Sequence, residues 1–197
     1  MPKSQTQPAA PAAVRLGGTD PIKRMLEGLS AENREAIQRL FGEISRITGR
    51  ELTHTDPLEL FNAITSQTVG GLYVDVPSTQ IREAIHPDAW PRLGAGLVAG
   101  GSGLAFPFWS TTTRAVQRLA VIFLRHSFNP TENGIGLVKA SYLVTAIHEM
   151  AHIAARDNRI IDHPAMNRAG ETLGARHFDD YVEKKCIDPR YWSFPPN

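Results

Sequence analysis

Three residues in the second half of the chain have the types and the spacing of a zinc site. His148 and His152 stand four positions apart, and Glu149 directly follows the first histidine. On an α-helix, side chains at positions i and i+4 lie one above the other, so both imidazoles point at one place, as two ligands of a tetrahedral zinc ion do. Glu149 lies about 100° further round the helix axis. There it can flank the metal and take a proton from a zinc-bound water molecule.

The run that contains these residues, 138–155, is predicted to be one buried helix. It lacks Gly and Pro, and Glu149 is its only formally charged side chain apart from Lys139 near its start. A helix that is apolar nearly all round is a buried helix. Polar side chains in its middle are costly unless something satisfies them, and a metal ion would do so. The alternative is a structural helix whose histidines bind backbone or carboxylate partners.

The pattern His-Glu-x-x-His and its uncharged neighbours, over residues 145–154, resemble the zinc-binding consensus of the zincin metallopeptidases. The resemblance implies a zincin-like α+β domain, mainly helical with a small β-sheet, in which the active-site helix is followed by a ligand-bearing helix. It also implies Zn²⁺ as the cofactor, His148 and His152 as ligands, and Glu149 as the catalytic base.

A catalytic zinc ion needs a third protein ligand and an open position. One large group of zincins places this ligand shortly after the second histidine, where Asn158, a poor zinc ligand, stands here. The thermolysin-like group takes a glutamate from the next helix, and Glu171 matches that arrangement. We therefore predict Glu171 as the third ligand. The alternatives are His163, His177, Asp179, Glu183 and Cys186.

The ligand-bearing helix is predicted to begin at Asp162 as N-cap, with Pro164 in its first turn, and to continue to about Cys186. Gly170 and Gly174 would let it pack closely beside the zinc helix. The thermolysin-like group also has an aspartate that supports a zinc histidine four residues after its glutamate. Ala175 stands there in this chain, so we predict that Asp179, on the same helix face as Glu171, gives this support. The oxyanion stabiliser stays open among Tyr181, Tyr191, His177 and His163.

The rest of the chain predicts one domain over residues 20–197, preceded by a disordered tail over residues 1–19 that is rich in Pro, Ala and polar residues. Three amphipathic helices are expected, over 20–29, from Ser30 to Gly49, and from Asp56-Pro57 to near residue 70. After these helices we expect a strand at 72–76, a helix from Pro77, and a glycine-rich loop or hairpin within 91–110. Residues 115–125 are predicted to form a helix or a strand, with 121–124 as a core strand in the second case.

Composition limits the function classes. The 197 residues are 42% hydrophobic and 21% charged, with a net charge of +1, which favours a globular domain without a nucleic-acid or membrane partner. The single cysteine excludes an internal disulfide framework. The first 19 residues lack the apolar region of a Sec signal peptide, so we expect a cytoplasmic protein or one exported by a specialised secretion system.

These observations predict a zinc-dependent metalloprotease that acts on a protein or peptide substrate. A compact zincin domain with a disordered front end resembles secreted bacterial effectors and toxins as a class, which implies cleavage of a host protein. Two alternatives stay open: a zinc hydrolase acting on cell-wall or other amides, and a non-enzymatic interaction module with a structural helix. The oligomeric state stays open as well.

Overall fold

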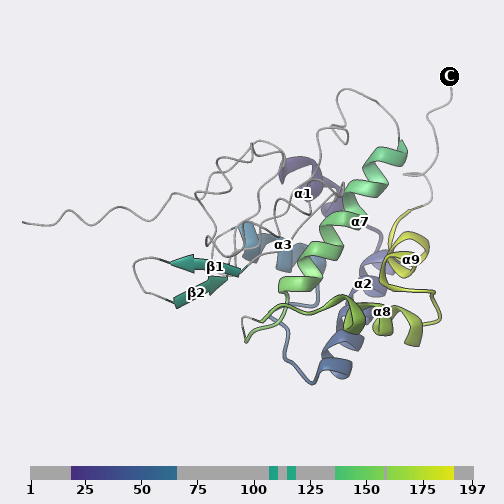
Figure 1. The fold of residues 1–197 in the computed structure, drawn as a ribbon. Helices are drawn as coiled ribbons and strands as arrows, with labels where there is room; N and C mark the ends of the chain where they lie inside the picture. Colours follow the sequence, from purple (N-terminus) through teal and green to yellow (C-terminus); the bar gives the residue numbers. More distant parts are fainter. Residues whose placement is uncertain (1–18, 66–106, 111–114, 119–135, 158, 189–197) are drawn as a thin grey trace, which may run out of the picture.

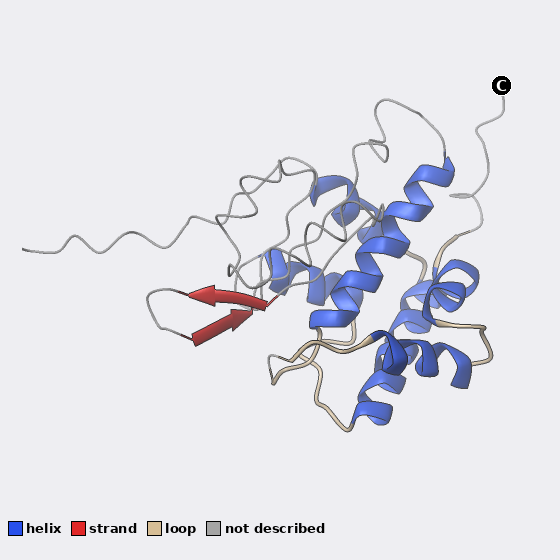
Figure 2. Ribbon diagram, viewed as in Figure 1, coloured by secondary structure: helices blue, strands red, loops and turns tan. Residues whose placement is uncertain are grey.

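The computed structural model describes residues 19–65, 107–110, 115–118, 136–157 and 159–188 (Figure 1). This part of the chain is mainly helical, with six α-helices, one short π-helix and one pair of strands (Figure 2). The prediction of a mainly helical domain is confirmed. The predicted tail lies outside the described residues except for Thr19. None of the described helices has the length and apolar character needed to cross a membrane.

The first three helices are α1 (Thr19–Glu27), α2 (Ala31–Thr48) and α3 (Pro57–Thr65). The predicted boundaries of α2 are confirmed, because the Ser30 hydroxyl accepts a hydrogen bond from the Asn33 amide and Gly49 ends the helix at a φ of 65°. Asp56 likewise accepts hydrogen bonds from the first amides of α3. One boundary is corrected: α1 begins at Thr19, so Asp20 lies inside its first turn and not at the cap.

Helix α7 (Gly136–Ile153) is the predicted apolar helix, and it packs against α1, α3 and the C-terminal helices. Its second half is buried nearly all round, and the buried side chains are Leu143, Val144, Ala146, Ile147, Met150, Ala151 and Ile153. Phe41 of α2, Phe61 of α3 and Phe178 are the largest side chains of the same core. The core therefore holds α7 on several sides and fixes the direction in which its histidines point.

Helix α7 ends two residues before the predicted boundary at Ala155, because the backbone there forms hydrogen bonds with another segment instead of continuing the helix. Leu52 and Ala155 form an isolated antiparallel bridge. The Thr53 amide donates to the Ala154 carbonyl at 2.8 Å, and the Arg156 amide donates to the Glu51 carbonyl at 2.8 Å. These hydrogen bonds between segments far apart in the sequence tie the end of α7 to the chain that leaves α2.

The prediction of one long helix from Asp162 to Cys186 is wrong. Three short elements stand there: α8 (His163–Thr172), α9 (Phe178–Tyr181) and the π-helix η3 (Val182–Cys186). Asp162 is the N-cap as predicted, and it accepts a hydrogen bond from the Ala165 amide at 3.0 Å. The chain then leaves the helix at Leu173 and Gly174, where a φ of 87° favours glycine.

Gly170 lets the backbone of another segment approach α8 closely, but that segment is not α7 as predicted. A Cβ atom at this position would lie 2.5 Å from the carbonyl oxygen of His177. Gly170 is therefore needed because the segment that begins α9 folds back against α8. This correction matters for the site, because it brings Asp179 of α9 next to α7.

The described strands are β1 (Pro107–Ser110) and β2 (Ala115–Arg118), which pair antiparallel with Pro107 opposite Arg118. The strand alternative is thus confirmed for residues 115–118. The predicted strands at 72–76 and 121–124, the helix from Pro77 and most of the glycine-rich segment lie outside the described residues.

The fold makes a testable prediction about two glycines. Gly170→Ala should lower the free energy of unfolding, because overpacking against the His177 backbone costs about 1–3 kcal/mol. Gly42→Ala is the matched control: Gly42 lies inside α2 with no other described residue within 4 Å of a Cβ there, so the change should stabilise by about 0.5–1 kcal/mol. Urea unfolding measures both. Equal free energies for the two variants would contradict the close packing at Gly170.

Candidate metal centre

Three histidines converge at the C-terminal end of α7. His148 and His152 lie one turn apart on that helix, and His163 is the first residue of α8. Each offers one ring nitrogen, and these atoms all lie within 4.8 Å of one another. His152 is buried, His148 is half-buried and His163 is exposed, so one side of the cluster is open to solvent. This arrangement could hold a metal ion.

The partners of the two α7 histidines decide which nitrogen faces the centre. Nδ1 of His148 lies 2.7 Å from a carboxylate oxygen of Asp179, and Nδ1 of His152 lies 2.5 Å from the Ile161 carbonyl oxygen. Both oxygens are acceptors, so each Nδ1 carries the proton and donates. In the neutral rings the Nε2 lone pairs are therefore free to bind a metal. The contact with Asp179 is the one that the sequence predicted.

Two pairs of Nε2 atoms lie close to the separation that tetrahedral coordination requires. Nε2 of His148 is 3.1 Å from Nε2 of His163 and 3.2 Å from Nε2 of His152. A zinc ion with Zn–N bonds of about 2.0–2.1 Å places its nitrogen ligands about 3.3 Å apart. Lone pairs that face one another at this distance repel, and a shared cation removes the repulsion. The donor set therefore fits a metal ion.

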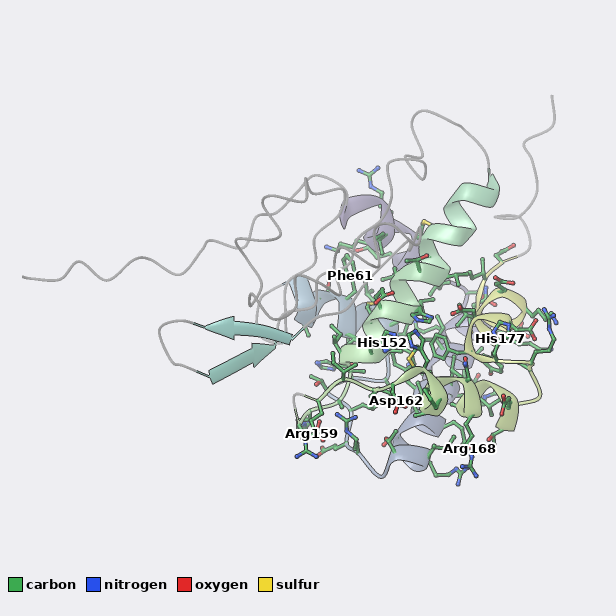
Figure 3. The ribbon with its side chains drawn as sticks, in the orientation of Figure 1. Phe61, His152, Arg159, Asp162, Arg168 and His177 are labelled. Carbon is green, nitrogen blue, oxygen red and sulfur yellow. The ribbon has the colours of Figure 1, made fainter. Side chains whose placement is uncertain are left out.

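The loop between α7 and α8 brings His163 to the other two histidines. The Ile161 amide donates to the His152 carbonyl at 2.8 Å, so Ile161 bonds both the backbone and the ring of His152. Ile161 is itself buried, and Asp162 then caps α8, which places His163 in the first turn. Figure 3 shows His152 on α7 beside Asp162 at the start of α8.

The structure does not bring Glu171, the predicted third ligand, to this cluster. Glu171 is exposed near the end of α8. It follows His163 by eight residues, which is about 12 Å along a helix axis. Because Ile161 is hydrogen-bonded to His152, the first turn of α8 lies next to the end of α7, and the last turn of α8 lies further away. His163, which the sequence left as an alternative, lies with His148 and His152 in the cluster.

The remaining alternatives have other places in the structure. The His177 ring accepts a hydrogen bond from the Asp180 amide and caps α9, and Glu183 is an exposed residue of η3. Cys186 is buried, and burial raises the pKa of its thiol to about 12. Tyr181 is buried on α9. Tyr191 lies outside the described residues.

Glu149 is buried beside the histidines, with 5% of its surface exposed. Its Oε2 atom makes no hydrogen bond to any residue that the structure describes. Burial raises the pKa of this carboxyl to about 7, the charge of His148 opposes the rise, and the charge of Asp179 adds to it. An unsatisfied buried carboxylate is costly and calls for a partner at that position.

Burial and hydrogen bonds act differently on the histidines. Burial lowers the pKa of His152 to about 4, although its hydrogen bond to Ile161 opposes this. Burial would also lower the pKa of His148, but the hydrogen bond and charge of Asp179 raise it overall. The pKa of His163 is lowered by burial and by the charge of His148. The neutral, metal-binding form of His152 and His163 is thus favoured near pH 7.

Comparisons with protein families, curated proteins and solved structures gave no match for this chain.

The first prediction for the site separates His163 from Glu171. His163→Ala should weaken metal binding by more than about 100-fold, because losing a ligand costs more than losing a residue that supports one. Glu171→Ala should change the affinity by less than about twofold, since an exposed residue remote from the cluster acts independently. Competition with a chromophoric zinc chelator measures both constants. A large loss of affinity in Glu171→Ala with little loss in His163→Ala would instead support Glu171 as the third ligand.

The second prediction concerns Asp179, whose carboxylate holds the His148 ring. Asp179→Asn keeps the size but removes the charge, and the metal affinity should fall by about 10–100-fold. Asp179→Glu, which keeps a carboxylate, should recover part of that loss. Isothermal titration with zinc checks both variants, with thermal melts of the metal-free proteins as the control for folding. Unchanged affinity in Asp179→Asn would show that the contact does not support the site.

Proposed function

We propose that this chain is a zinc-dependent metallopeptidase in which His148, His152 and His163 hold the metal and Glu149 is the catalytic base. One observation carries the proposal: three imidazole nitrogens converge next to a buried carboxylate whose Oε2 atom has no hydrogen-bond partner among the described residues. A structural histidine cluster would explain the ring contacts. It would not explain why an acidic residue is buried beside them without a hydrogen bond on Oε2.

Zinc is the metal that this donor set favours. Imidazole nitrogens suit zinc, and three protein ligands with one open position are typical of catalytic zinc sites. Structural zinc sites have four protein ligands. Among the described residues, only the three histidines form a group with metal-binding geometry, and the exposed side at His163 leaves room for substrate. Asp179 and Ile161 orient two of the rings, as the hydrogen-bond partners of metal-binding histidines usually do.

A bound zinc ion would activate water and polarise the carbonyl of the scissile bond. Glu149 then accepts a proton from the attacking water and passes it to the leaving amine. Burial of Glu149 raises its pKa in the metal-free chain, toward the neutral range that suits a group that takes up and releases a proton. The order His-Glu-x-x-His on one helix favours peptide bonds as the substrate class. Secretion as an effector and a host protein target remain predictions from the sequence.

The test is the substitution Glu149→Gln. This variant should keep one zinc ion per chain, because Glu149 is not among the ligands, and it should lose peptidase activity by at least about 10²-fold, the usual size of general-base help. Zinc content is measured by atomic absorption, and activity is measured on an unfolded, fluorescently labelled protein.

His152→Ala is the matched control, because it should lose both metal and activity. A wild-type chain that stays metal-free after zinc loading would refute the proposal. A wild type that binds zinc and cleaves cell-wall muropeptides but no protein would move the function to the amidase alternative.

A further inference from the structure

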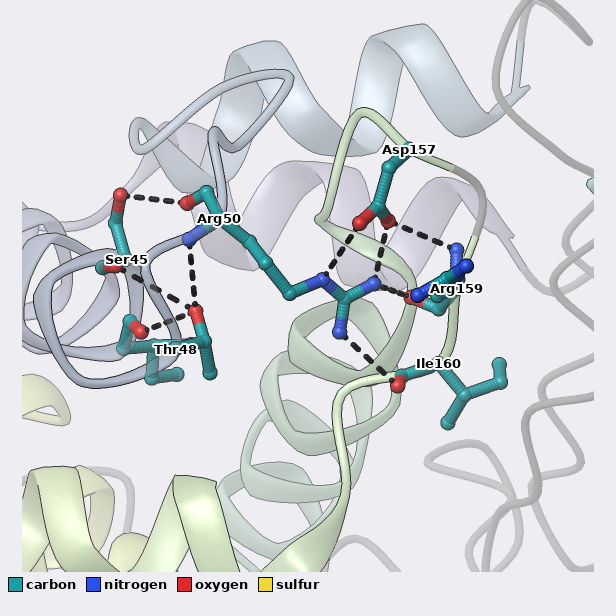
Figure 4. Close-up of polar contacts among 7 residues, drawn as sticks. Ser45, Thr48, Arg50, Asp157, Arg159 and Ile160 are labelled. Atoms are coloured by element: carbon teal, nitrogen blue, oxygen red, sulfur yellow. Dashed lines mark hydrogen bonds and ion pairs between the residues drawn. The ribbon is translucent and has the colours of Figure 1, made fainter.

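Arg50 connects α2 to the loop that supplies the third histidine (Figure 4). Its Nε lies 2.9 Å from one carboxylate oxygen of Asp157, and one terminal nitrogen lies 2.5 Å from the other. Further guanidinium hydrogen bonds go to the Arg159 carbonyl and, at 3.2 Å, to the Ile160 carbonyl. One side chain therefore binds three positions of a loop that is more than 100 residues away in the sequence.

The backbone of Arg50 is itself held in place. The Arg50 carbonyl accepts a hydrogen bond from the Ser45 hydroxyl at 2.7 Å, and the Arg50 amide donates to the Thr48 hydroxyl at 3.3 Å. Gly49, in the left-handed conformation, turns the chain just before it. The Arg50 side chain is 20% exposed and the Asp157 side chain is 45% exposed, so solvent screens the ion pair mainly from the side of the aspartate. Arg50, just after the end of α2, is thus the fixed partner in this contact.

The ordered loop leads directly into the metal centre. Arg50 binds the carbonyls of residues 159 and 160, Ile161 binds His152, and His163 follows two residues later. Arg159 and Ile160 are exposed, so burial in the core does not hold these two positions.

We propose that Arg50 is a positioning residue for the metal centre, which holds residues 157, 159 and 160 so that His163 meets His148 and His152 before any metal binds. The proposal rests on the proposed function, because it assigns Arg50 a role toward the same metal. Preorganisation raises affinity because the ligand no longer has to be ordered when the metal arrives. Lysine can replace the arginine only in part, since only the planar guanidinium forks onto a carboxylate while it also donates to two carbonyls.

The experiment is a thermodynamic cycle with four proteins: wild type, R50A, H163A and the double variant. Zinc affinity is measured by competition with a chelator. R50A should weaken binding by about 10–100-fold, the effect typical of residues that orient a ligand. In the H163A background the same change should cost less than about twofold, because Arg50 acts through His163. Equal losses in both backgrounds would overturn the proposal and show only general destabilisation.

Two further variants keep the test informative. R50K should lose less affinity than R50A, and it replaces R50A in the cycle if R50A does not fold. R156A is the matched control, because the Arg156–Glu51 ion pair lies on the same loop but both side chains are exposed, and its affinity should stay within about twofold of wild type. The absorption spectrum of the Co²⁺-loaded R50A protein should shift toward that of H163A. A wild-type spectrum would count against the proposal.

A metal-free measurement separates this inference from the proposed function. In protein without metal, R50A should accelerate hydrogen exchange of the Ile161 amide, which bonds to His152, and leave the amides in the middle of α2 unchanged. Unchanged exchange at Ile161 would overturn the role of Arg50 even if wild type binds zinc. Faster exchange in R50A, together with a wild type that binds no zinc, would instead refute the proposed function and leave Arg50 as the anchor of the loop.

Discussion

The site depends on the double hydrogen bond between His152 and Ile161. The Ile161 amide donates to the His152 carbonyl, and the His152 ring donates back to the Ile161 carbonyl. The first bond closes the loop at the end of α7, and the second fixes which ring nitrogen faces the cluster. Because His163 follows two residues later, the same pair of bonds decides which residue becomes the third donor. A longer or looser loop would not return the first turn of α8 to α7.

Helix α7 couples the core to the chemistry. Its apolar side chains lie in one cluster with the large aromatic residues of α2, α3 and α9, so the helix cannot rotate without loss of burial. That rigidity keeps the two imidazoles aimed at one point. It also buries Glu149 without a partner for Oε2 among the described residues, which costs stability. Proteins accept such costs mainly at functional sites, which agrees with the proposed role of Glu149.

The break after α8 is as important to the site as the helix itself. Gly174 ends α8, Gly170 lets the His177 backbone pack against it, and α9 then presents Asp179 to His148. A continuous helix would have carried Asp179 away from α7 along the line of α8. The π-helix η3 follows directly, and π-helical turns occur frequently near functional sites. Asp179 therefore reaches His148 because the helix is broken after α8, and the sequence pattern did not predict this break.

The sequence by itself determined the features that depend on neighbouring residues. The helix α7 follows from its apolar composition, the helix ends at Ser30, Gly49 and Asp162 follow from local capping, and the His148–His152 pair follows from i, i+4 spacing. Asp179 was also predicted to support a histidine, although from a continuous helix. The position of His163 could not be predicted, because it depends on contacts between residues more than 100 positions apart, such as those of Arg50 with residues 157, 159 and 160. The pattern of neighbouring residues does not determine how the loop between α7 and α8 folds back. Only the packing of α2 against the segments that follow α7 decides this.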